Sequence, residues 1–359
     1  MVHSDFPMER RVSVYPSDRR IARVVICLSL VATFMALAVS SHAATAPLRT
    51  FWVTRSTLES PETIRRAVAA AAGGGFDTIM VPVGLTADVS QVFDGAFEII
   101  KEARGRGLRV YAWIEVTLVA AGGELLASRD HVLYQHPEWL MVPRELAPEV
   151  MKVDVRSPAY LGRLARWARG NAPRIDGLYL SPISAEAASY LVTAVTSAAK
   201  RYAVDGVFLD AMRFPGTDFD YSRHAMEIFR AETRPQLSAD ERARLDEIES
   251  IDPFGYAEEF PDRWRQFRQS RVTDLMSRMR KALASTNPTL VVSAGVAADS
   301  GTALADSFQD WTTWMKTGLV DGVGRRSGTS GTIVFTPDGF AAGGVYSSDA
   351  QPSGTDNAR

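Results

Sequence analysis

The sequence has very little cysteine: Cys27 is the only one in 359 residues. It lies in an apolar run near the N-terminus, so the rest of the chain has no thiol for a disulfide, a nucleophile or a thiolate metal site. The chain also lacks a Walker loop, a dinucleotide-binding glycine motif, Cys/His zinc spacing and tandem repeats. We therefore expect no cofactor and no bound metal.

The charge balance is nearly even. The chain carries 40 lysines and arginines against 42 aspartates and glutamates, which gives a formal net charge of −2. This balance gives no electrostatic reason to expect a nucleic acid as the partner. A hydrophobic content of 46% suits an ordinary globular core.

The N-terminal residues have the features of a secretory signal. Arginines within residues 19–23 precede an uncharged apolar run over residues 24–39, which ends in small residues. We expect cleavage after Ala43, with Ala46 the next choice, so that residues 1–43 are removed. The protein would then be secreted or periplasmic. The alternative is an uncleaved anchor, which would be its only contact with a membrane.

Short apolar runs alternate with helical segments over most of the remaining chain. Expected strands fall at 49–54, 76–83, 108–116, 204–210, 289–297 and 319–323, and the segments between them include helical patterns such as 185–202 and 264–284. This alternation predicts a parallel sheet with right-handed crossovers. We expect an α/β fold, a (β/α) TIM-barrel-type domain of about six units over residues 47–323.

Two segments depart from the alternation. Residues 117–182 contain short apolar runs between turn residues, and we expect a hairpin-type insertion over one face of the barrel there. From Gly324 the sequence is rich in Gly, Ser and Thr, and only 36 residues follow Val323. That length is too short for two more β/α units, so we expect an incomplete barrel with a disordered tail over 324–359.

Several motifs resemble a known family. They are WVTR, FEIIKEARGRGLRVYAWIEV, HPEWL, YLSP, VDGVFLDAMRFP followed by DFDYS, and QDWTTWMKTGLVDGV. Together they are similar to the glycosyl-hydrolase-like 10 family of extracellular bacterial proteins. The resemblance implies a TIM-barrel-type domain that acts on glycans, and a characterised branch of that family acts on peptidoglycan glycan strands. The chain departs from the family after Val323, and at Glu115, where members often have asparagine.

Asp210 is the first candidate catalytic residue. It ends the apolar run GVFLD, and a carboxylate at the carboxyl end of a barrel strand faces the cleft where such barrels place their chemistry. The resemblance places the family's aspartate at the same position, and the role we expect is nucleophile or stabiliser of an oxocarbenium ion. Arg213 would hold Asp210 ionised or grip substrate oxygens; alternatively the two form a structural ion pair.

Glycoside hydrolysis requires a second carboxyl group. Glu115 ends the third expected strand and is the preferred candidate; Asp310, in the QDW segment, is the other, and Asp154 is a lesser one. Asp205 and Asp321 each precede a glycine at the start of a strand, and we expect them to be turn or cap residues. His136 and His224 have no partners in the pattern and are interpreted as structural.

Sugar sites also need flat apolar rings and polar groups. Trp113, Trp139, Phe214 and Tyr221 lie next to the expected cleft, and each is either a sugar platform or a core residue. Asp218, on a loop beside the cleft, either binds sugar or is solvated. The sequence therefore predicts a secreted glycoside hydrolase that cleaves a polysaccharide, and peptidoglycan glycan strands are one such substrate. The alternatives are a catalytically inactive glycan-binding barrel and a truncated remnant that folds poorly.

Overall fold

The structure is a computed structural model that describes residues 50–85, 94–297, 299–325 and 346–347. The expected signal peptide and most of the expected tail lie outside these residues. Within them, no helix has the length and apolar character needed to cross a membrane.

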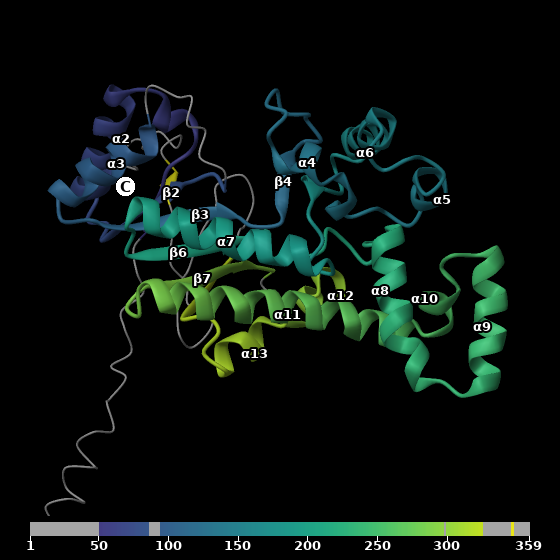
Figure 1. Cartoon of the computed structure of the whole chain (residues 1–359). Coiled ribbons are helices and arrows are strands. Elements are labelled where there is room, and N and C mark those ends of the chain that lie inside the picture. The colour runs from purple at the N-terminus through teal and green to yellow at the C-terminus, as the bar shows by residue number, and fades with distance from the viewer. Residues whose placement is uncertain (1–49, 86–93, 298, 326–345, 348–359) are drawn as a thin grey trace, which may run out of the picture. The chain divides into compact units, whose positions relative to one another are not determined.

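The sheet strands and the helices alternate along the chain (Figure 1). The strands are β1 (Thr50–Trp52), β2 (Thr78–Pro82), β3 (Arg109–Glu115), β4 (Leu118–Ala121), β5 (Gly177–Tyr179), β6 (Gly206–Asp210), β7 (Val291–Val296), β8 (Gly322–Arg325) and β9 (Tyr346–Ser347). The α-helices are α2 (Pro61–Gly73), α3 (Gly95–Gly105), α4 (Val132–Gln135), α5 (Ala147–Val150), α6 (Pro158–Gly170), α7 (Ala185–Tyr202), α8 (Arg223–Thr233), α9 (Ala239–Ile251), α10 (Gly255–Glu259), α11 (Pro261–Thr286), α12 (Ser300–Ser307) and α13 (Trp311–Lys316). Short 3₁₀ helices span Ser56–Glu59, Pro137–Trp139 and Arg234–Gln236.

The main sheet confirms the predicted incomplete barrel. Six parallel strands lie in the order β1-β2-β3-β6-β7-β8, and they are the six strands expected from the sequence. The two-residue strand β9 pairs in parallel with the other side of β1. β8 continues to Arg325, two residues past the boundary expected at Val323. All six carboxyl ends therefore meet at one edge, where barrels of this type hold their sites.

The amino ends of the strands are tied by aspartates. The Asp205 carboxylate accepts a hydrogen bond from Val110 N at 2.8 Å, and the Asp321 carboxylate accepts one from Val292 N at 2.8 Å. Each aspartate thus continues the ladder to the neighbouring strand. The prediction that these two residues have structural roles is confirmed.

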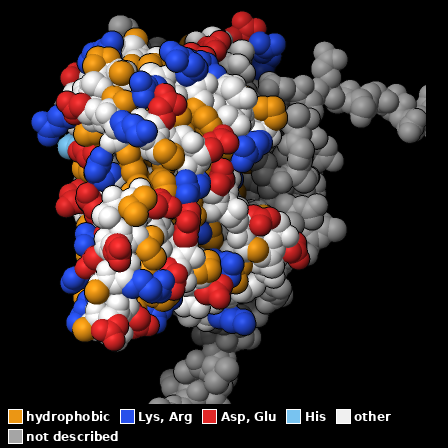
Figure 2. Space-filling model, turned by 90° about the vertical axis from the view of Figure 1, so that its right-hand side faces the viewer, with side chains coloured by type: hydrophobic (Ala, Val, Ile, Leu, Met, Phe, Trp, Pro, Cys, Tyr) orange, Lys and Arg blue, Asp and Glu red, His pale blue; other side chains and the backbone are white. Residues whose placement is uncertain are grey.

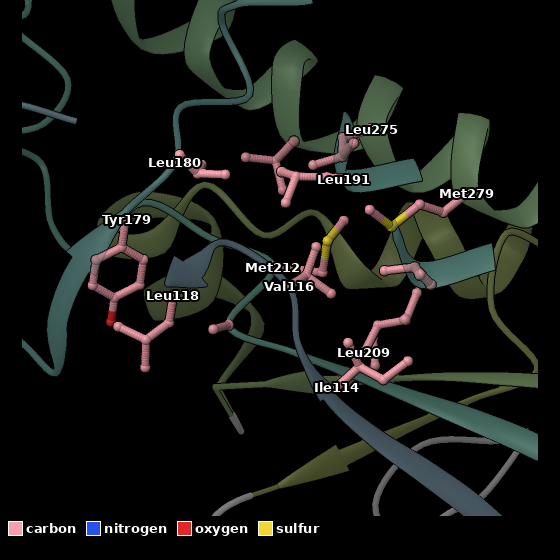
Figure 3. Close-up of a cluster of buried hydrophobic side chains, with 14 of the residues drawn as sticks. Ile114, Val116, Leu118, Tyr179, Leu180, Leu191, Leu209, Met212, Leu275 and Met279 are labelled. Atoms are coloured by element: carbon pink, nitrogen blue, oxygen red, sulfur yellow. The ribbon is translucent and has the colours of Figure 1, made fainter. Parts of the chain in front are cut away.

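The outer face of the sheet carries the main hydrophobic core. Ile114 of β3 and Leu209 of β6 are fully buried, and they point toward Leu191 of α7 and Leu275 and Met279 of α11 (Figure 3). Helices α7 and α11 pack against each other over this face (Figure 1). The alternation of side chains along each strand then turns the intervening residues to the opposite, inner face.

That inner face is aromatic. Met80, Tyr111 and Phe208 are buried there, and Trp52 and Trp113 pack against them, half-buried. These residues lie at alternate positions of β1, β2, β3 and β6. They form a second, smaller cluster, which ends in the carboxylates of Glu115 and Asp210 at the carboxyl edge of the sheet.

The predicted insertion is a small separate unit. Strands β4 and β5 pair antiparallel and form their own two-stranded sheet, with α4, α5 and α6 between them in sequence. The chain then returns through α7 to β6, beside β3. The insertion therefore interrupts one β/α unit without adding a strand to the main sheet.

Helices α8, α9 and α10 continue the chain beyond β6. The start of α9 is fixed by a capping box between Ser238 and Glu241, as its sequence suggests. Acidic and basic side chains are interspersed over the face that carries α5, α9 and α10 (Figure 2). Mixed charge on this face does not favour a polyanion as its partner.

Candidate active site

A pocket of about 200 Å³ lies at the carboxyl edge of the sheet. Its walls come from the ends of β1, β3, β6 and β7, from the insertion, and from the loop between α12 and α13. The lining residues are Trp52, Glu115, Leu118, Asp176, Phe208, Asp210, Ala211, Arg213, Gly295, Val296, Ala297, Ser307 and Gln309. Three carboxylates and one guanidinium thus meet over an aromatic floor.

Glu115 and Asp210 are brought together by strand register. They are paired positions on the neighbouring parallel strands β3 and β6, and both side chains line the pocket. Neighbouring strands lie about 4.8 Å apart, so the two side chains leave the sheet side by side and on the same face. The sequence predicted both residues; the register explains why they share one cleft.

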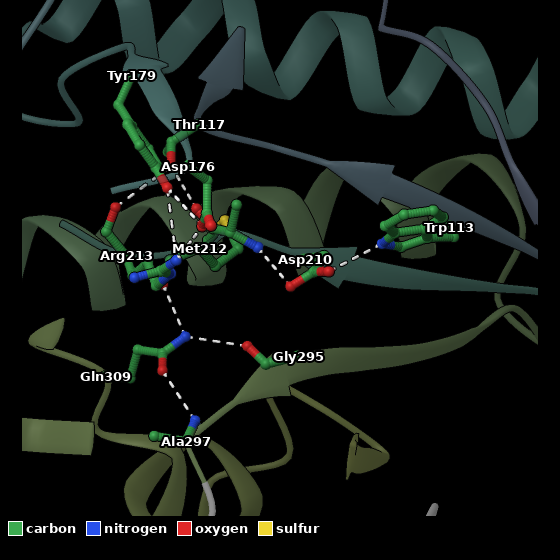
Figure 4. Close-up of polar contacts among 11 residues, drawn as sticks. Trp113, Thr117, Asp176, Tyr179, Asp210, Met212, Arg213, Gly295, Ala297 and Gln309 are labelled. Atoms are coloured by element: carbon green, nitrogen blue, oxygen red, sulfur yellow. Dashed lines mark hydrogen bonds and ion pairs between the residues drawn. The ribbon is translucent and has the colours of Figure 1, made fainter. Parts of the chain in front are cut away.

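The Asp210 carboxylate is held by two N–H donors (Figure 4). The indole Nε1 of Trp113 donates to Oδ2 at 2.9 Å, and the backbone N of Ala211 donates to Oδ1 at 2.8 Å. Two donors suit an ionised carboxylate, because its oxygens only accept hydrogen bonds. Ala211 has a φ of 53°, a left-handed conformation that costs a non-glycine residue about 1 kcal/mol. The strained backbone of Ala211 therefore positions its N–H group to donate to the Asp210 carboxylate.

Trp113 was expected to be either a sugar platform or a core residue. In the structure its indole N–H donates to Asp210, and Trp113 is not among the residues that line the pocket. Trp52 of β1 lines the pocket instead and contacts Trp113 edge to face, with ring centroids 4.4 Å apart. The aromatic side chains that line the pocket are thus Trp52 and Phe208, and Trp113 packs against Trp52.

Glycine at position 295 leaves room for the carboxylate. A Cβ at this position of β7 would lie 2.6 Å from Asp210 Oδ1 and 3.1 Å from the ring of Phe208. No real Cβ tolerates the first of these distances. A side chain at residue 295 would therefore displace Asp210.

Gln309 fixes the far wall of the pocket (Figure 4). Its amide, 1% exposed, donates to Met212 O at 3.2 Å and to Gly295 O at 3.0 Å, and it accepts from Ala297 N at 3.3 Å. One side chain thus links the turn after β6 to the end of β7 and to the residue that follows β7. The sequence pointed to the adjacent Asp310; the residue that reaches the pocket is Gln309.

Arg213 pairs with the insertion. Its guanidinium contacts Asp176 Oδ2 at 2.5 Å, and the Tyr179 hydroxyl donates to the same oxygen at 3.0 Å. Burial raises the pKa of the Tyr179 phenol, which keeps it a neutral donor. The expected pairing of Arg213 with Asp210 is wrong: among the described contacts, Asp210 is held by N–H groups, and Asp176 holds the guanidinium.

Glu115 also has a cationic neighbour. Arg55, just past β1, reaches Glu115 Oε2 at 3.1 Å, with the side chains 67% and 24% exposed respectively. The arginine is open to solvent, so this pair is weakly held. The segment from Trp52 to Arg55 thus contributes an aromatic wall to the pocket and a cation beside Glu115.

Several predicted site residues lie elsewhere. Asp310 caps α13, since its carboxylate accepts from Thr313 N at 3.2 Å, and it does not line the pocket. Phe214 is fully buried against Phe308 and has no face free for a sugar. Tyr221 is half-buried and packs on aromatic rings of the helical end of the domain.

The remaining predicted residues belong to the insertion or its border. Trp139 stacks on His136, with centroids 3.7 Å apart, which gives that histidine a structural neighbour as expected. Asp218 forms an ion pair with Arg174 at 3.2 Å. Neither Trp139 nor Asp218 lines the pocket. Asp154 and His224 line a separate pocket.

Four residues of the site were missed. Trp52 and Arg55 stand in the WVTR segment at the end of the first strand, where the strand-end rule that found Asp210 also applies. Gln309 precedes Asp310, but a neutral amide gives no catalytic signal. Asp176 lies in the insertion, and no periodicity places it beside the sheet. In the described part of the chain, no group of three or more His, Cys, Asp or Glu residues is placed to hold a metal ion.

Comparison with known proteins bears on this site. The profile described as glycosyl hydrolase-like 10 matches residues 88–326, more than half of the chain. The resemblance seen in the motifs is thereby confirmed, although the profile match begins well after residue 47. No curated protein matches the sequence.

Solved structures are similar in fold at low identity. The PgaB (BpsB) glycoside hydrolase domain from Bordetella bronchiseptica is 14% identical, with 77% of this chain and 73% of that chain covered and a TM-score of 0.48. A β-galactosidase from the psychrophilic Marinomonas ef1 is 9% identical, with 78% and 41% covered and a TM-score of 0.52. A β-galactosidase from Rahnella sp. R3 is 16% identical, with 79% and 40% covered and a TM-score of 0.49. The chain thus spans about two fifths of each β-galactosidase chain.

Proposed function

The chain belongs to the glycosyl hydrolase-like 10 family, and from this premise we propose that it is a glycoside hydrolase whose two working carboxyl groups are Asp210 and Glu115. The observation that carries the proposal is their register pairing at the edge of one pocket. Glycoside hydrolysis needs one carboxyl group on each side of the reacting bond, and strand pairing supplies such a pair on rigid elements.

The roles follow from the contacts. An Asp210 oxygen forms a bond to the anomeric carbon as the bond from that carbon to the leaving oxygen breaks, and the Glu115 carboxyl gives its proton to that oxygen. Water, deprotonated by Glu115, then releases the sugar from Asp210. Trp113 and the Ala211 N–H aim the nucleophile, and Trp52 offers a ring face for the sugar. Arg213, already on the pocket wall, would bind substrate oxygens.

The proposed substrate is a polysaccharide, and peptidoglycan glycan strands are the first to test. We further propose that residues 1–43 direct secretion, so that the enzyme meets its glycan outside the cytoplasm; contact with the membrane would occur only through this segment if it is not cleaved. N-terminal sequencing of protein recovered from the periplasm or medium should begin at Ala44. Recovery of the intact N-terminus from the membrane fraction would replace secretion with anchoring.

Loss of one carboxylate tests the catalytic proposal. Asp210→Asn keeps the shape of the side chain and removes the nucleophile, so release of new reducing ends from glycan should fall by about a hundredfold to ten-thousandfold. Asp240→Asn, an exposed change on α9, is the control and should retain activity. Thermal melting should be cooperative in all three proteins. Undiminished turnover by Asp210→Asn would remove Asp210 from the mechanism.

One observation favours a second function. Glu115 is ion-paired with Arg55, so the residue that must give a proton stands beside a cation. A barrel without a working acid would bind glycan and not cleave it. Retention on insoluble glycan with no release of reducing ends by the unaltered protein would support this alternative.

A further inference from the structure

A second pocket, of about 430 Å³, lies between the insertion and the first turn of α8. It shares no lining residue with the candidate active site. We propose that this pocket binds a small primary amine with an apolar body. The inference uses the geometry and charge of this pocket alone and does not depend on glycoside cleavage.

The walls of the pocket are aliphatic. They are formed by Val142, Val150, Met151, Val153 and Val155. The volume is in the range of pockets that enclose small molecules, about 300–1,000 Å³. An apolar lining of this kind gains most from a hydrocarbon body that displaces water from it.

One polar group inside the pocket lacks a partner. Tyr160 lines the pocket and is 6% exposed, yet its hydroxyl makes no hydrogen bond within the described residues. Burial raises the pKa of this phenol, and the nearby negative charges of Asp220 and Glu138 raise it further. The hydroxyl is therefore neutral, and a ligand that brought a polar group to it would take the place of water as its hydrogen-bond partner.

The charged side chains around the pocket favour a positively charged ligand. Glu138, Asp154 and Glu227 line it, against Arg223 and His224. The Arg223 guanidinium donates to Met151 O at 2.6 Å, which fixes its position and leaves its positive charge in place. Glu138 contacts His136 at 3.0 Å. Glu227 makes no hydrogen bond or ion pair to another described residue, so its charge is available.

Two further groups contribute to the electrostatic environment of this pocket. Asp220 is buried beside the pocket and accepts from Val142 N at 2.8 Å and Ser222 N at 2.9 Å, while burial raises its pKa. The N-terminus of α8 adds a partial positive charge, but the Ser222 hydroxyl already accepts from Ala225 N at 3.1 Å. The lining carries three carboxylates, Glu138, Asp154 and Glu227, against one guanidinium, Arg223. An ammonium group suits this site, and a carboxylate ligand would face repulsion.

Three probes with the same six-carbon chain distinguish a cationic ligand from an anionic or a neutral one. Isothermal titration of the purified chain with n-hexylamine, hexanoate and 1-hexanol at pH 7.5 varies the head group and keeps the apolar body. We expect hexylamine to bind at least about tenfold more tightly than either of the others, because only its ammonium meets the acidic lining. Thermal melting in the presence of each probe gives an independent readout of binding.

Four variants locate the binding. Tyr160→Phe removes the hydroxyl and Glu227→Gln removes the free charge, and each should weaken hexylamine by about fivefold. Val153→Trp places a ring in the cavity and should abolish saturable binding. Glu247→Gln, an exposed charge change on α9, is the matched control and should bind as the unaltered protein does. If Val153→Trp fails to melt cooperatively, Tyr160→Phe and Glu227→Gln decide the question.

Three results would overturn the proposal. They are no saturable hexylamine binding up to about 10 mM, which marks the weakest affinity of interest; hexanoate or hexanol binding as tightly as the amine; and hexylamine binding unchanged by both Tyr160→Phe and Glu227→Gln. Because none of these readouts uses glycan, failure here leaves the catalytic proposal standing, and failure of Asp210→Asn to lose activity leaves this one standing.

Discussion

Glu115 and Asp210 are register partners on β3 and β6, although the whole insertion and α7 separate them in sequence. The insertion leaves the sheet just after Glu115, and the chain re-enters at β6 so that Asp210 ends level with Glu115. Parallel pairing fixes this level through several backbone hydrogen bonds. The adjacency of the two residues is thus a property of the sheet and does not depend on loop conformation.

The proposed mechanism predicts the stereochemical outcome. With Asp210 as the nucleophile and Glu115 as the acid on the adjacent strand, hydrolysis passes through a covalent intermediate, as in retaining enzymes. We expect the first product released to keep the anomeric configuration of the bond cleaved. Proton NMR of a reaction followed from its first minutes reads the anomer directly. Initial release of the opposite anomer would show that a water, and not Asp210, attacks.

Arg55 should set how readily Glu115 gives its proton. Replacing Arg55 by glutamine removes a positive charge 3.1 Å from the carboxylate, and a carboxyl group without a cation beside it keeps its proton to higher pH. The basic limb of the profile of kcat against pH should therefore move upward. Stability should fall by no more than about 1 kcal/mol, because the pair is exposed.

Arg66→Gln is the control for that change. Arg66 lies on α2, 4.0 Å from Glu62, with both side chains largely exposed. The profile of kcat against pH of the Arg66→Gln variant should match that of the unaltered protein. An unmoved basic limb in Arg55→Gln would mean that Arg55 does not influence the proton donor.

Gln309 should be costly to replace. Gln309→Leu leaves two buried carbonyls and one N–H without their partner, which we expect to lower the free energy of unfolding by about 2–4 kcal/mol. Urea denaturation followed by circular dichroism measures it. Gln236→Leu, an exposed change after α8, should cost less than about 0.5 kcal/mol. Equal losses in the two variants would show that the Gln309 contacts add nothing to stability.

Asp246 should give the helical end of the domain an acid-sensitive stability. Hydrogen bonds from Arg234 and Tyr256 hold the pKa of Asp246 well below its ordinary value of 3.8. A carboxyl group with a depressed folded-state pKa stabilises the protein above 3.8 and loses that contribution as the pH falls below it. Asp246→Asn should therefore lower Tm at pH 7, and the difference from the unaltered protein should shrink below about pH 4.

Glu247→Gln, one residue along on the exposed side of α9, provides the comparison for Asp246. Its Tm should follow that of the unaltered protein at every pH. A Tm difference for Asp246→Asn that stays constant down to about pH 2 would assign the loss to packing and not to the charge.

The fold was predictable where local pattern and sheet geometry agree. The run that ends in Asp210 and the helix 185–202 each carry a strong periodic signal, and both are found as expected. The insertion was predicted in kind, but its helices were not. Helices α4 and α5 are single turns with little periodicity of their own, whereas the 13-residue α6 has an apolar face that the sequence analysis did not use.

The site was predictable only in part, and the reason is physical. A carboxylate at the end of a buried strand is costly enough to stand out, which is why Asp210 and Glu115 could be found. The direction of a side chain was harder to predict. Phe214 and Asp310 each follow a residue that lines the pocket, yet Phe214 faces the core and Asp310 caps a helix. Asp176 enters from the insertion, whose placement depends on long-range packing that no short window of sequence contains.

The missing side chain at residue 295 has a consequence for how this sequence can vary. Its space is taken by the Asp210 carboxylate of the adjacent strand, so any larger residue must compete with that group and not with its own neighbours along β7. Residues 210 and 295 should therefore covary. A relative that lacks the aspartate can have a larger residue at position 295, whereas one that retains the aspartate cannot. Pairs of residues seen at these two sites in other genomes would then separate working enzymes from descendants that have lost the reaction.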